Sequence, residues 1–388
     1  MLDETLLDTP DALARADRLG LLRGAAEAGA RVRTAARHAV EAGIAELKPE
    51  GRPRALLLAG PGTAASGVAD LITALAGPTV PVTRLGPSGV ASAAGALRWA
   101  LPGWAGPVDL LLITTTDGTE PGLALLAEQA YRRGCTVVAV SPRRSPLTEA
   151  VVGAHGLSVP LATAPYDGHQ RPEEVPESAA APGSFWSLLT PLLILLDRVG
   201  IVTAPPETIN LVADRLDRTA ERCGPTVTTY GNPAKTLASE LAESLPLIWS
   251  EGTPAAPAGR RFAAVLGELA GHPALAAELP EALPAHSALL AGGFGGGAAD
   301  PEAATDDSPD DFFRDRVDDP QTLRPRVVLL RARPAGGLTA APAARELALA
   351  HDAPISELEP EEGVELEALA ELIATTDFAA VYLALASA

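Results

Sequence analysis

Two stretches rich in glycine and hydroxyl side chains are where this sequence could hold an anion. The first, Gly60–Gly67 ("GPGTAASG"), and the second, Thr114–Gly122 ("TTTDGTEPG"), each follow an apolar run and precede a helical pattern. The free N–H groups and the positive dipole end of a helix amino terminus attract anions, and hydroxyl groups add donors. We therefore expect a phosphate group to bind at Gly62, Thr63, Ser66, Gly67, Thr114, Thr116 and Thr119.

Other interpretations of these stretches remain open. Threonines before a helix are commonly only caps. The first stretch lacks the three-glycine dinucleotide spacing and the Gly-Lys-Ser/Thr ending of a P-loop, which makes a nucleotide-binding α/β protein the weakest alternative. Asp117 carries a charge that would repel a phosphate. If its side chain points inward, the affinity should be poor, and if it points away, the site survives.

The sequence around these residues predicts strands that alternate with helices. The apolar runs are continuous rather than alternating, which is typical of parallel strands covered on both faces. In such sheets ligands bind at the carboxyl ends of the strands. The predicted strands of the first half are "RALLLAG", "TVPVTRL", "DLLLITTT", "CTVVAVS" and "GLSVPL".

A second round of the same pattern begins near Pro205. Asn232 followed by Pro233 is a strong helix start, with a capping side chain and proline at the first helical position. The predicted strands are "LPLIWSEG", "RPRVVLLRAR" and "PISELEP". The expected fold class is therefore α/β, with two units that each hold a parallel sheet flanked by helices.

Composition excludes several classes of protein. The 388 residues carry a formal net charge of -19, which argues against a nucleic-acid partner. Cys135 and Cys223 form no disulfide framework and read as inert thiols. The acidic start has no signal peptide, and charged residues and Pro191 interrupt the most apolar segment, Phe185–Val202. We expect a cytoplasmic protein with no membrane span and a buried helix over 185–199.

Two segments read as connections. Ala164–Gly183 is rich in proline and acid and is expected to be an exposed loop. Gly292–Asp311 is expected to be a flexible acidic linker between the two units. Its aspartates lack the spacing of a calcium loop, so no metal site is expected.

With these features together, the sequence resembles the sugar isomerase (SIS) domain proteins, and most specifically the actinobacterial bifunctional phosphoglucose/phosphomannose isomerases. The resemblance runs through the two loops, "VVAVSPRRSPLTEA", "YGNPAKTLASELAESLPLIWSEG", "DDFFRDRVDDP" and "TTDFAAVYLALA". The family pattern of the second loop, Ser-Tyr-Ser-Gly-x-Thr-x-Glu, puts Thr114, Thr116 and Thr119 on its hydroxyl positions. The Ser-Gly pair of the first loop is displaced to Ser66-Gly67.

The resemblance implies an architecture. It predicts flavodoxin-like three-layer domains: a helical lead-in over 1–29, a first SIS domain over 30–200 with the phosphate-binding loops, and a second over 201–388. It also implies a homodimer, with a sugar phosphate as ligand and no cofactor. In the family a histidine from the partner subunit completes the site. Here that histidine is missing, but the apolar helix over 185–199 still needs burial, which favours a dimer.

The resemblance further implies catalytic residues. Aldose–ketose isomerisation needs a base that moves a proton between adjacent carbons and an acid that opens the sugar ring. Alignment on Leu279–Glu281 ("LPE") places Glu268 on the family's glutamate, with glycine and leucine in place of the flanking asparagines. Pro284 stands at the histidine position, and His286 is the nearest substitute.

Three hypotheses follow. The favoured one is a sugar-phosphate-binding SIS protein of the phosphoglucose/phosphomannose isomerase family with weak or lost isomerase activity. The alternative is an active glucose-6-phosphate/mannose-6-phosphate isomerase with a rebuilt site, in which Glu268 is the base and His286 opens the ring. A nucleotide-binding α/β protein is the least favoured.

Overall fold

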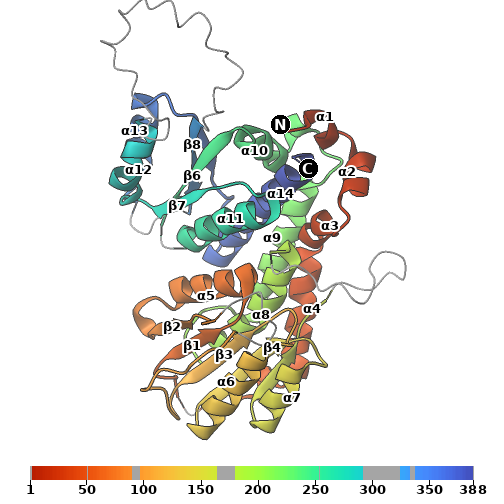
Figure 1. The fold of residues 1–388 in the computed structure, drawn as a ribbon, viewed down its shortest axis with the longest axis vertical. Coiled ribbons are helices and arrows are strands. Elements are labelled where there is room, and N and C mark those ends of the chain that lie inside the picture. The colour runs from red at the N-terminus through yellow and green to blue at the C-terminus, as the bar shows by residue number, and fades with distance from the viewer. Residues whose placement is uncertain are drawn as a thin grey trace, which may run out of the picture.

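The computed structural model describes residues 2–49, 51–89, 97–163, 180–252, 254–291, 324–332 and 337–387. These residues form two parallel sheets, one of five strands and one of four, with helices on both faces of each (Figure 1). The predicted α/β class with two SIS-type units is confirmed.

The first sheet has the strand order β2-β1-β3-β4-β5. Its strands are β1 (Leu56–Ala59), β2 (Val82–Leu85), β3 (Leu110–Thr114), β4 (Thr136–Ser141) and β5 (Leu157–Pro160). Helices α4 (Ala28–Glu41), α5 (Gly62–Ala76) and α8 (Pro182–Arg198) pack on one face, and α6 (Pro121–Arg132) and α7 (Pro146–Gly153) pack on the other. Ala59 pairs with Ile113, so the connections that leave β1 and β3 lie side by side.

The second sheet repeats the arrangement with the order β7-β6-β8-β9. Its strands are β6 (Ser244–Glu251), β7 (Leu275–Glu278), β8 (Arg324–Arg331) and β9 (Ile355–Leu358). Helices α11 (Ala255–Ala270) and α14 (Glu365–Ala386) cover one face, and α12 (Ala282–Leu290) and α13 (Ala341–Ala350) cover the other. Sequence reasoning did not identify β7, α12 or α14.

The remaining helices are α1 (Glu4–Leu7), α2 (Pro10–Ala16), α3 (Leu21–Ala26), α9 (Pro206–Cys223) and α10 (Pro233–Leu241), with short 3-10 turns at Ile44–Glu46, Gly77–Thr79 and Thr229–Gly231. Among these helices, α3 and α9 contact helices of both units. The Asn232 side chain accepts from the N–H groups of Ala234 and Lys235 and caps α10, which confirms the predicted helix start. The amide of Asp3 donates to the carbonyl of Ala386 at 2.8 Å, so the chain ends meet beside the second sheet. The domain boundaries at 29/30 and 200/201 stay a prediction.

Three connection and burial predictions have different outcomes. Residues 164–179 and 292–323 lie outside the described part of the chain. Residues 180–183 are buried and include the start of α8, so the predicted exposed loop does not extend to Gly183. The segment 292–323 follows α12 and precedes β8, and β6, β7, β8 and β9 share one sheet, so placing it between the two units was wrong. The predicted buried helix is α8, and the chain itself buries it among α4, α5 and the first sheet. Burial of this helix therefore gives no reason to form a dimer.

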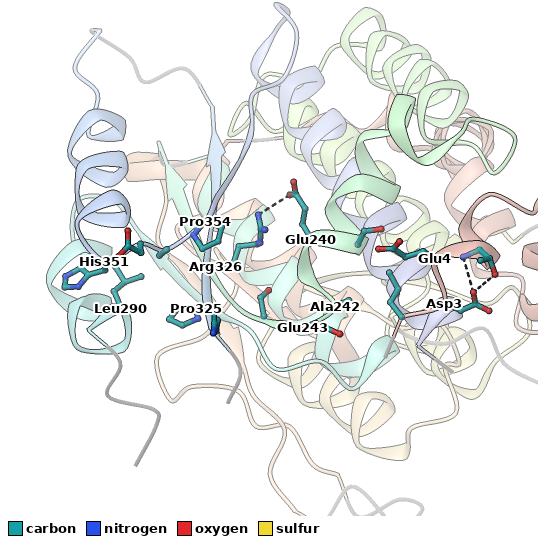
Figure 2. A pocket seen from close by; sticks show the side chains of 17 residues that line it. Asp3, Glu4, Glu240, Ala242, Glu243, Leu290, Pro325, Arg326, His351 and Pro354 are labelled. Carbon is teal, nitrogen blue, oxygen red and sulfur yellow. Dashed lines mark hydrogen bonds and ion pairs between the residues drawn. The ribbon is translucent and has the colours of Figure 1, made fainter. Parts of the chain in front are cut away.

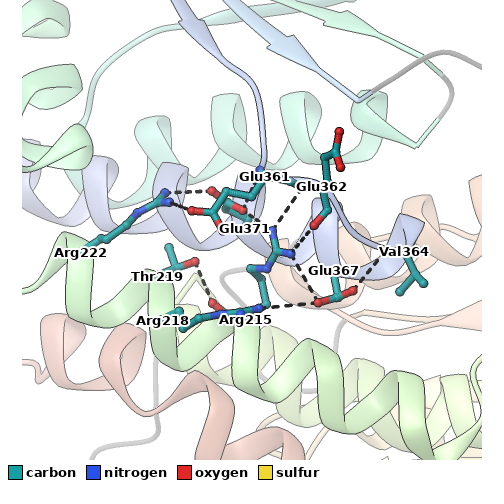
Figure 3. A network of polar contacts seen from close by, with 9 residues as sticks. All are labelled: Arg215, Arg218, Thr219, Arg222, Glu361, Glu362, Val364, Glu367 and Glu371. Carbon is teal, nitrogen blue, oxygen red and sulfur yellow. Dashed lines mark hydrogen bonds and ion pairs between the residues drawn. The ribbon is translucent and has the colours of Figure 1, made fainter.

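Helix α14 is long and apolar enough by composition to cross a membrane, and 83% of its most apolar window is buried inside the protein. A buried polar network fixes the turn that leads into it (Figure 3). Arg215 of α9 donates to the carboxylate of Glu371 at 2.6 Å and to the carbonyl of Glu362 at 2.9 Å. Arg222 also donates to Glu371, at 2.8 Å. These bonds hold α9 against the start of α14.

The two units meet where α5 packs against α11 in antiparallel orientation (Figure 1). Near one end Arg260 of α11 pairs with Asp70 of α5 at 3.2 Å. Beside it the guanidinium of Arg261 lies 4.4 Å from the ring centroid of Phe185 in α8. Arg261 also forms an ion pair of 2.9 Å with Asp377 of α14, and both side chains are only 2% exposed. One buried cation thus connects three helices.

We expect Asp377→Ala to lower the free energy of unfolding by about 3–5 kcal/mol, because it leaves the buried Arg261 charge without its partner. Arg33→Ala is the control, since its pairs with Asp214 and Asp217 are exposed and contribute about 1 kcal/mol or less each. Urea unfolding followed by circular dichroism measures both. Equal losses for the two variants would contradict the role given to Arg261.

Candidate functional site

The connection after β1 is shorter than the sequence suggested. A Cβ atom at Gly60 would lie 2.2 Å from the carbonyl oxygen of Thr114, so only glycine fits between the ends of β1 and β3. Gly62 has a φ of +81°, in the left-handed region, and α5 begins there. Thr63 and Ser66 therefore belong to the first turns of a helix rather than to a loop.

Two helix amino ends meet at this edge of the first sheet. Helix α5 follows β1 and α6 follows β3, and these strands are neighbours. Within the described ranges, no side chain caps either helix. The first N–H groups of a helix have no partner inside it, and its positive dipole end adds to their attraction for anions. The edge therefore has the electrostatics of an anion site.

Glu268 reaches this edge from the second domain. It lies in the last turn of α11, with its side chain exposed. The hydroxyl Oγ1 of Thr63 donates to Glu268 Oε2 across 205 residues of sequence. The antiparallel packing of α5 and α11 thus brings the predicted base to the predicted phosphate site.

The second loop is organised by Thr115, which sequence reasoning missed. Its Oγ1 accepts from the N–H groups of Asp117 at 3.2 Å and Gly118 at 3.1 Å, and donates to Glu120 at 3.2 Å. The hydroxyl of Thr119 donates to Asp117 Oδ2 at 2.5 Å. The Asp117 carboxylate therefore turns toward the loop and accepts the hydrogen bond that Thr119 would otherwise donate to a phosphate.

The other predicted phosphate ligands divide between the edge and the core. Thr114 is buried and Thr116 is half-buried, and in the described part of the chain their hydroxyls make no hydrogen bond. Ser66 Oγ donates to the Gly62 carbonyl at 2.9 Å and accepts from Arg84 at 2.6 Å. Gly67 faces the core, where an added Cβ would contact the ring of Phe185 at 3.4 Å.

Arg84 is the second residue that sequence reasoning missed. It lies on β2, paired in register with Leu58 of β1, and its side chain is exposed. The sequence could have indicated Arg84, because a cation near the carboxyl end of a strand that neighbours β1 must lie near the connection that leaves β1. Arg84 places a positive charge beside Ser66.

At this edge of the first sheet, carboxylates nevertheless outnumber cations among the described side chains. Asp117, Glu120 and Glu268 each accept a hydrogen bond from a threonine hydroxyl. Burial raises the pKa of Glu120, and the Asp117 charge raises it further. The hydroxyls of Thr63, Thr115 and Thr119 are thus already engaged by internal acceptors, and an incoming anion must compete with these acceptors.

The structure does not bring His286 together with Glu268. His286 lies on α12, 8% exposed, and its Nδ1 accepts from Trp249 Nε1 at 2.9 Å. Trp249 faces the α12 and α13 side of the second sheet, whereas α11 covers the opposite face. The other nearby histidine, His272, has its Nε2 2.9 Å from the Ser244 carbonyl. In the resembled family this histidine comes from the partner subunit, so the separation of His286 from Glu268 within one chain does not test the predicted role of His286.

Pockets lie elsewhere in the described structure. One of about 920 Å³ opens between the first residues of the chain and the amino ends of β6 and β8, where Arg326 pairs with Glu240 at 3.4 Å (Figure 2). Another, of about 770 Å³, lies at the amino ends of β1, β3 and β4. Neither includes a predicted site residue. Among the described residues, no group of three or more His, Cys, Asp or Glu side chains could hold a metal ion. Burial raises the pKa of both cysteine thiols, which disfavours the reactive thiolates.

We expect His286 to make the protein less stable in mild acid. Burial lowers its pKa below the ordinary 6.5, so the unfolded chain binds the proton more readily and stability falls as the pH drops below that value. Urea unfolding at about pH 5.5 and about pH 7.5 measures this loss, which His286→Gln should reduce. The exposed His155 gives the control variant, His155→Gln. An unchanged pH dependence in His286→Gln would contradict the buried neutral assignment.

Comparison with known proteins adds family and fold. Residues 231–388 match the family described as the bacterial phospho-glucose isomerase C-terminal SIS domain. No curated protein matches the chain.

Solved structures match over nearly the whole chain at low sequence identity. A Silicibacter pomeroyi protein described as a phosphosugar isomerase is 17% identical, with a TM-score of 0.60 over 93% of this chain and 95% of that one. The C-terminal domain of glucosamine-fructose-6-phosphate aminotransferase from Francisella tularensis is 11% identical, with a TM-score of 0.55 over 95% and 96%. Tagatose-6-phosphate ketose/aldose isomerase from Escherichia coli is 13% identical, with a TM-score of 0.50 over 95% and 91%. These likenesses show the fold. Residues 231–388 therefore belong to the family described as the bacterial phospho-glucose isomerase C-terminal SIS domain, and the chain as a whole has the fold of these solved structures.

Proposed function

We propose that this protein binds a sugar phosphate, of the glucose 6-phosphate, fructose 6-phosphate or mannose 6-phosphate class, and has weak or no aldose–ketose isomerase activity. One observation carries the proposal: the uncapped amino ends of α5 and α6 meet at the edge that Glu268 reaches through Thr63. The phosphate binds at the helix ends, and the sugar extends toward Glu268. The family match of residues 231–388 supports this class of ligand.

The position of Glu268 suits a base, but its neighbours do not support one. A carboxylate that moves a proton between two sugar carbons needs groups that orient it and stabilise the charge on the enediol. Gly267, Leu269 and Gly271 provide no side-chain donor. His286, the proposed ring-opening acid, lies on the other face of the second sheet, bonded to Trp249. Proton transfer at the sugar carbons therefore lacks its usual stabilising donors, and ring opening lacks an exposed acid at His286.

The alternative, an active isomerase with a rebuilt site, rests on a specific observation. Thr63 holds Glu268 at the predicted phosphate site, where a base for proton transfer would be needed. A nucleotide-binding function has no comparable support. That the protein is a cytoplasmic homodimer is part of the proposal: the homodimer rests on the family resemblance, and the cytoplasmic location rests on the composition.

We expect Asp117→Asn to tighten glucose 6-phosphate binding by about tenfold, because removing a like charge beside a bound phosphate is worth roughly 1.4 kcal/mol after screening. Glu128→Gln is the matched control, because it removes the same charge from an exposed position on α6. Titration calorimetry at constant ionic strength compares both with the native protein. Equal effects would mean that Asp117 does not face the ligand, and absence of binding in every variant would exclude sugar-phosphate binding.

We expect conversion of fructose 6-phosphate to an aldose phosphate to be at least about a hundredfold slower than in an intact isomerase, the usual cost of one missing stabilising donor. Any residual turnover should disappear in Glu268→Gln. A coupled assay for glucose 6-phosphate and mannose 6-phosphate measures it. Fast turnover that Glu268→Gln abolishes and His286→Ala impairs would establish the alternative and refute weak or lost activity.

A further inference from the structure

The second domain repeats the geometry that makes the first sheet edge attractive to anions. The orders β2-β1-β3-β4 and β7-β6-β8-β9 are the same arrangement, so β6 and β8 correspond to β1 and β3. Helix α13 follows β8 as α6 follows β3. The amino end of α13 therefore lies at the carboxyl edge of the second sheet, where a parallel α/β sheet offers its ligand position.

This second position is occupied by a side chain of the protein. Glu251, the last residue of β6, is 4% exposed and directs its carboxylate at the start of α13. Its Oε1 accepts from the N–H groups of Ala340 at 2.6 Å and Ala341 at 3.1 Å, and from Thr339 Oγ1 at 2.5 Å. Its Oε2 accepts from Arg331 Nε at 3.1 Å. Two backbone donors, one hydroxyl and one guanidinium thus surround a buried carboxylate.

The first domain differs at the matching strand end. There the chain has Gly60, which carries no side chain, and no described side chain caps α5 or α6. In the second domain the N-cap residue of α13 is Ala340, which cannot cap the helix itself, and Glu251 replaces the cap. The carboxyl edge of the first sheet is therefore open to a ligand, whereas the Glu251 carboxylate occupies that of the second sheet.

We propose that the carboxyl edge of the second sheet is a built anion site for a carboxylate or similar small oxyanion, and that the chain fills it permanently with Glu251. The occupant stays charged, because hydrogen bonds from Thr339, Arg331 and the backbone offset burial and hold the pKa of Glu251 below its usual range. The start of α13 therefore offers no second ligand position, and a sugar phosphate binds at the corresponding edge of the first domain. The anion site itself does not depend on the proposed function.

Chemical rescue tests the site directly. Glu251→Ala removes one methylene and a carboxylate, which have the size and charge of acetate. We expect the melting temperature of this variant to fall, and then to rise saturably with sodium acetate, because a ligand that binds only the folded state stabilises it. Sodium chloride at equal ionic strength should give no such rise. The native protein and Glu251→Gln, whose side chains occupy the position, should not respond to acetate.

Glu359→Ala is the matched control. It removes the other carboxylate partner of Arg331, at 2.9 Å, but lies outside the start of α13. No saturable acetate response in Glu251→Ala, or an equal response in Glu359→Ala, would overturn the proposal. If Glu251→Ala does not stay folded in chloride, its refolding yield from urea in acetate against chloride gives the same comparison. Glucose 6-phosphate is absent from every arm, so failure here and failure of sugar-phosphate binding are distinguishable.

Discussion

The packing of α5 against α11 is the contact on which the candidate site depends. One helix follows the first strand of the first sheet and the other follows the corresponding strand of the second. Because they run antiparallel, the start of α5 lies beside the end of α11, and Thr63 meets Glu268. Arg260 and Arg261 fix the other end of this contact through Asp70, Phe185 and Asp377. A shift of α11 along α5 by one turn, about 5.4 Å, would remove Glu268 from the anion edge.

Electrostatics then decides what this edge can do. Two helix amino ends and Arg84 attract an anion to this edge. The nearby carboxylates repel it and already accept hydrogen bonds from the threonine hydroxyls. A hydroxyl has a single proton, so Thr63 and Thr119 cannot donate to a ligand without releasing Glu268 and Asp117. Ligand binding is thus coupled to the state of the predicted base. In the second domain, by contrast, the Glu251 carboxylate of the chain itself occupies the amino end of α13.

Local patterns predicted the framework well. The apolar strands, the two-unit organisation and the Asn232 cap follow from short-range physics, since burial on both faces and a missing helix partner leave clear sequence signals. Strand β7 was missed because its sequence, "LAAE", is dominated by helix-forming residues and its burial is only partial. Its pairing with Leu247 to Ser250 of β6 makes it a strand.

The candidate site was predictable only in part, because its geometry depends on side-chain pairings and on contacts between distant parts of the chain. Residue types at the ends of β1 and β3 indicated an anion position, but which donors are free depends on side-chain pairings such as Thr119 with Asp117. The family resemblance placed Glu268 and His286 in one site through the "LPE" alignment, with the histidine position supplied by the partner subunit. The sheet separates them, since α11 and α12 cover opposite faces and Trp249 binds the histidine.

The most direct test of the account is a crystal structure of the protein with glucose 6-phosphate at saturating concentration. The account predicts phosphate oxygens within hydrogen-bonding distance of the first N–H groups of α5 and α6, with the sugar toward Glu268 and Glu251 still bonded to Ala340 and Ala341. A sugar phosphate bound instead in the pocket beside Arg326, or at the start of α13 in place of Glu251, would contradict it.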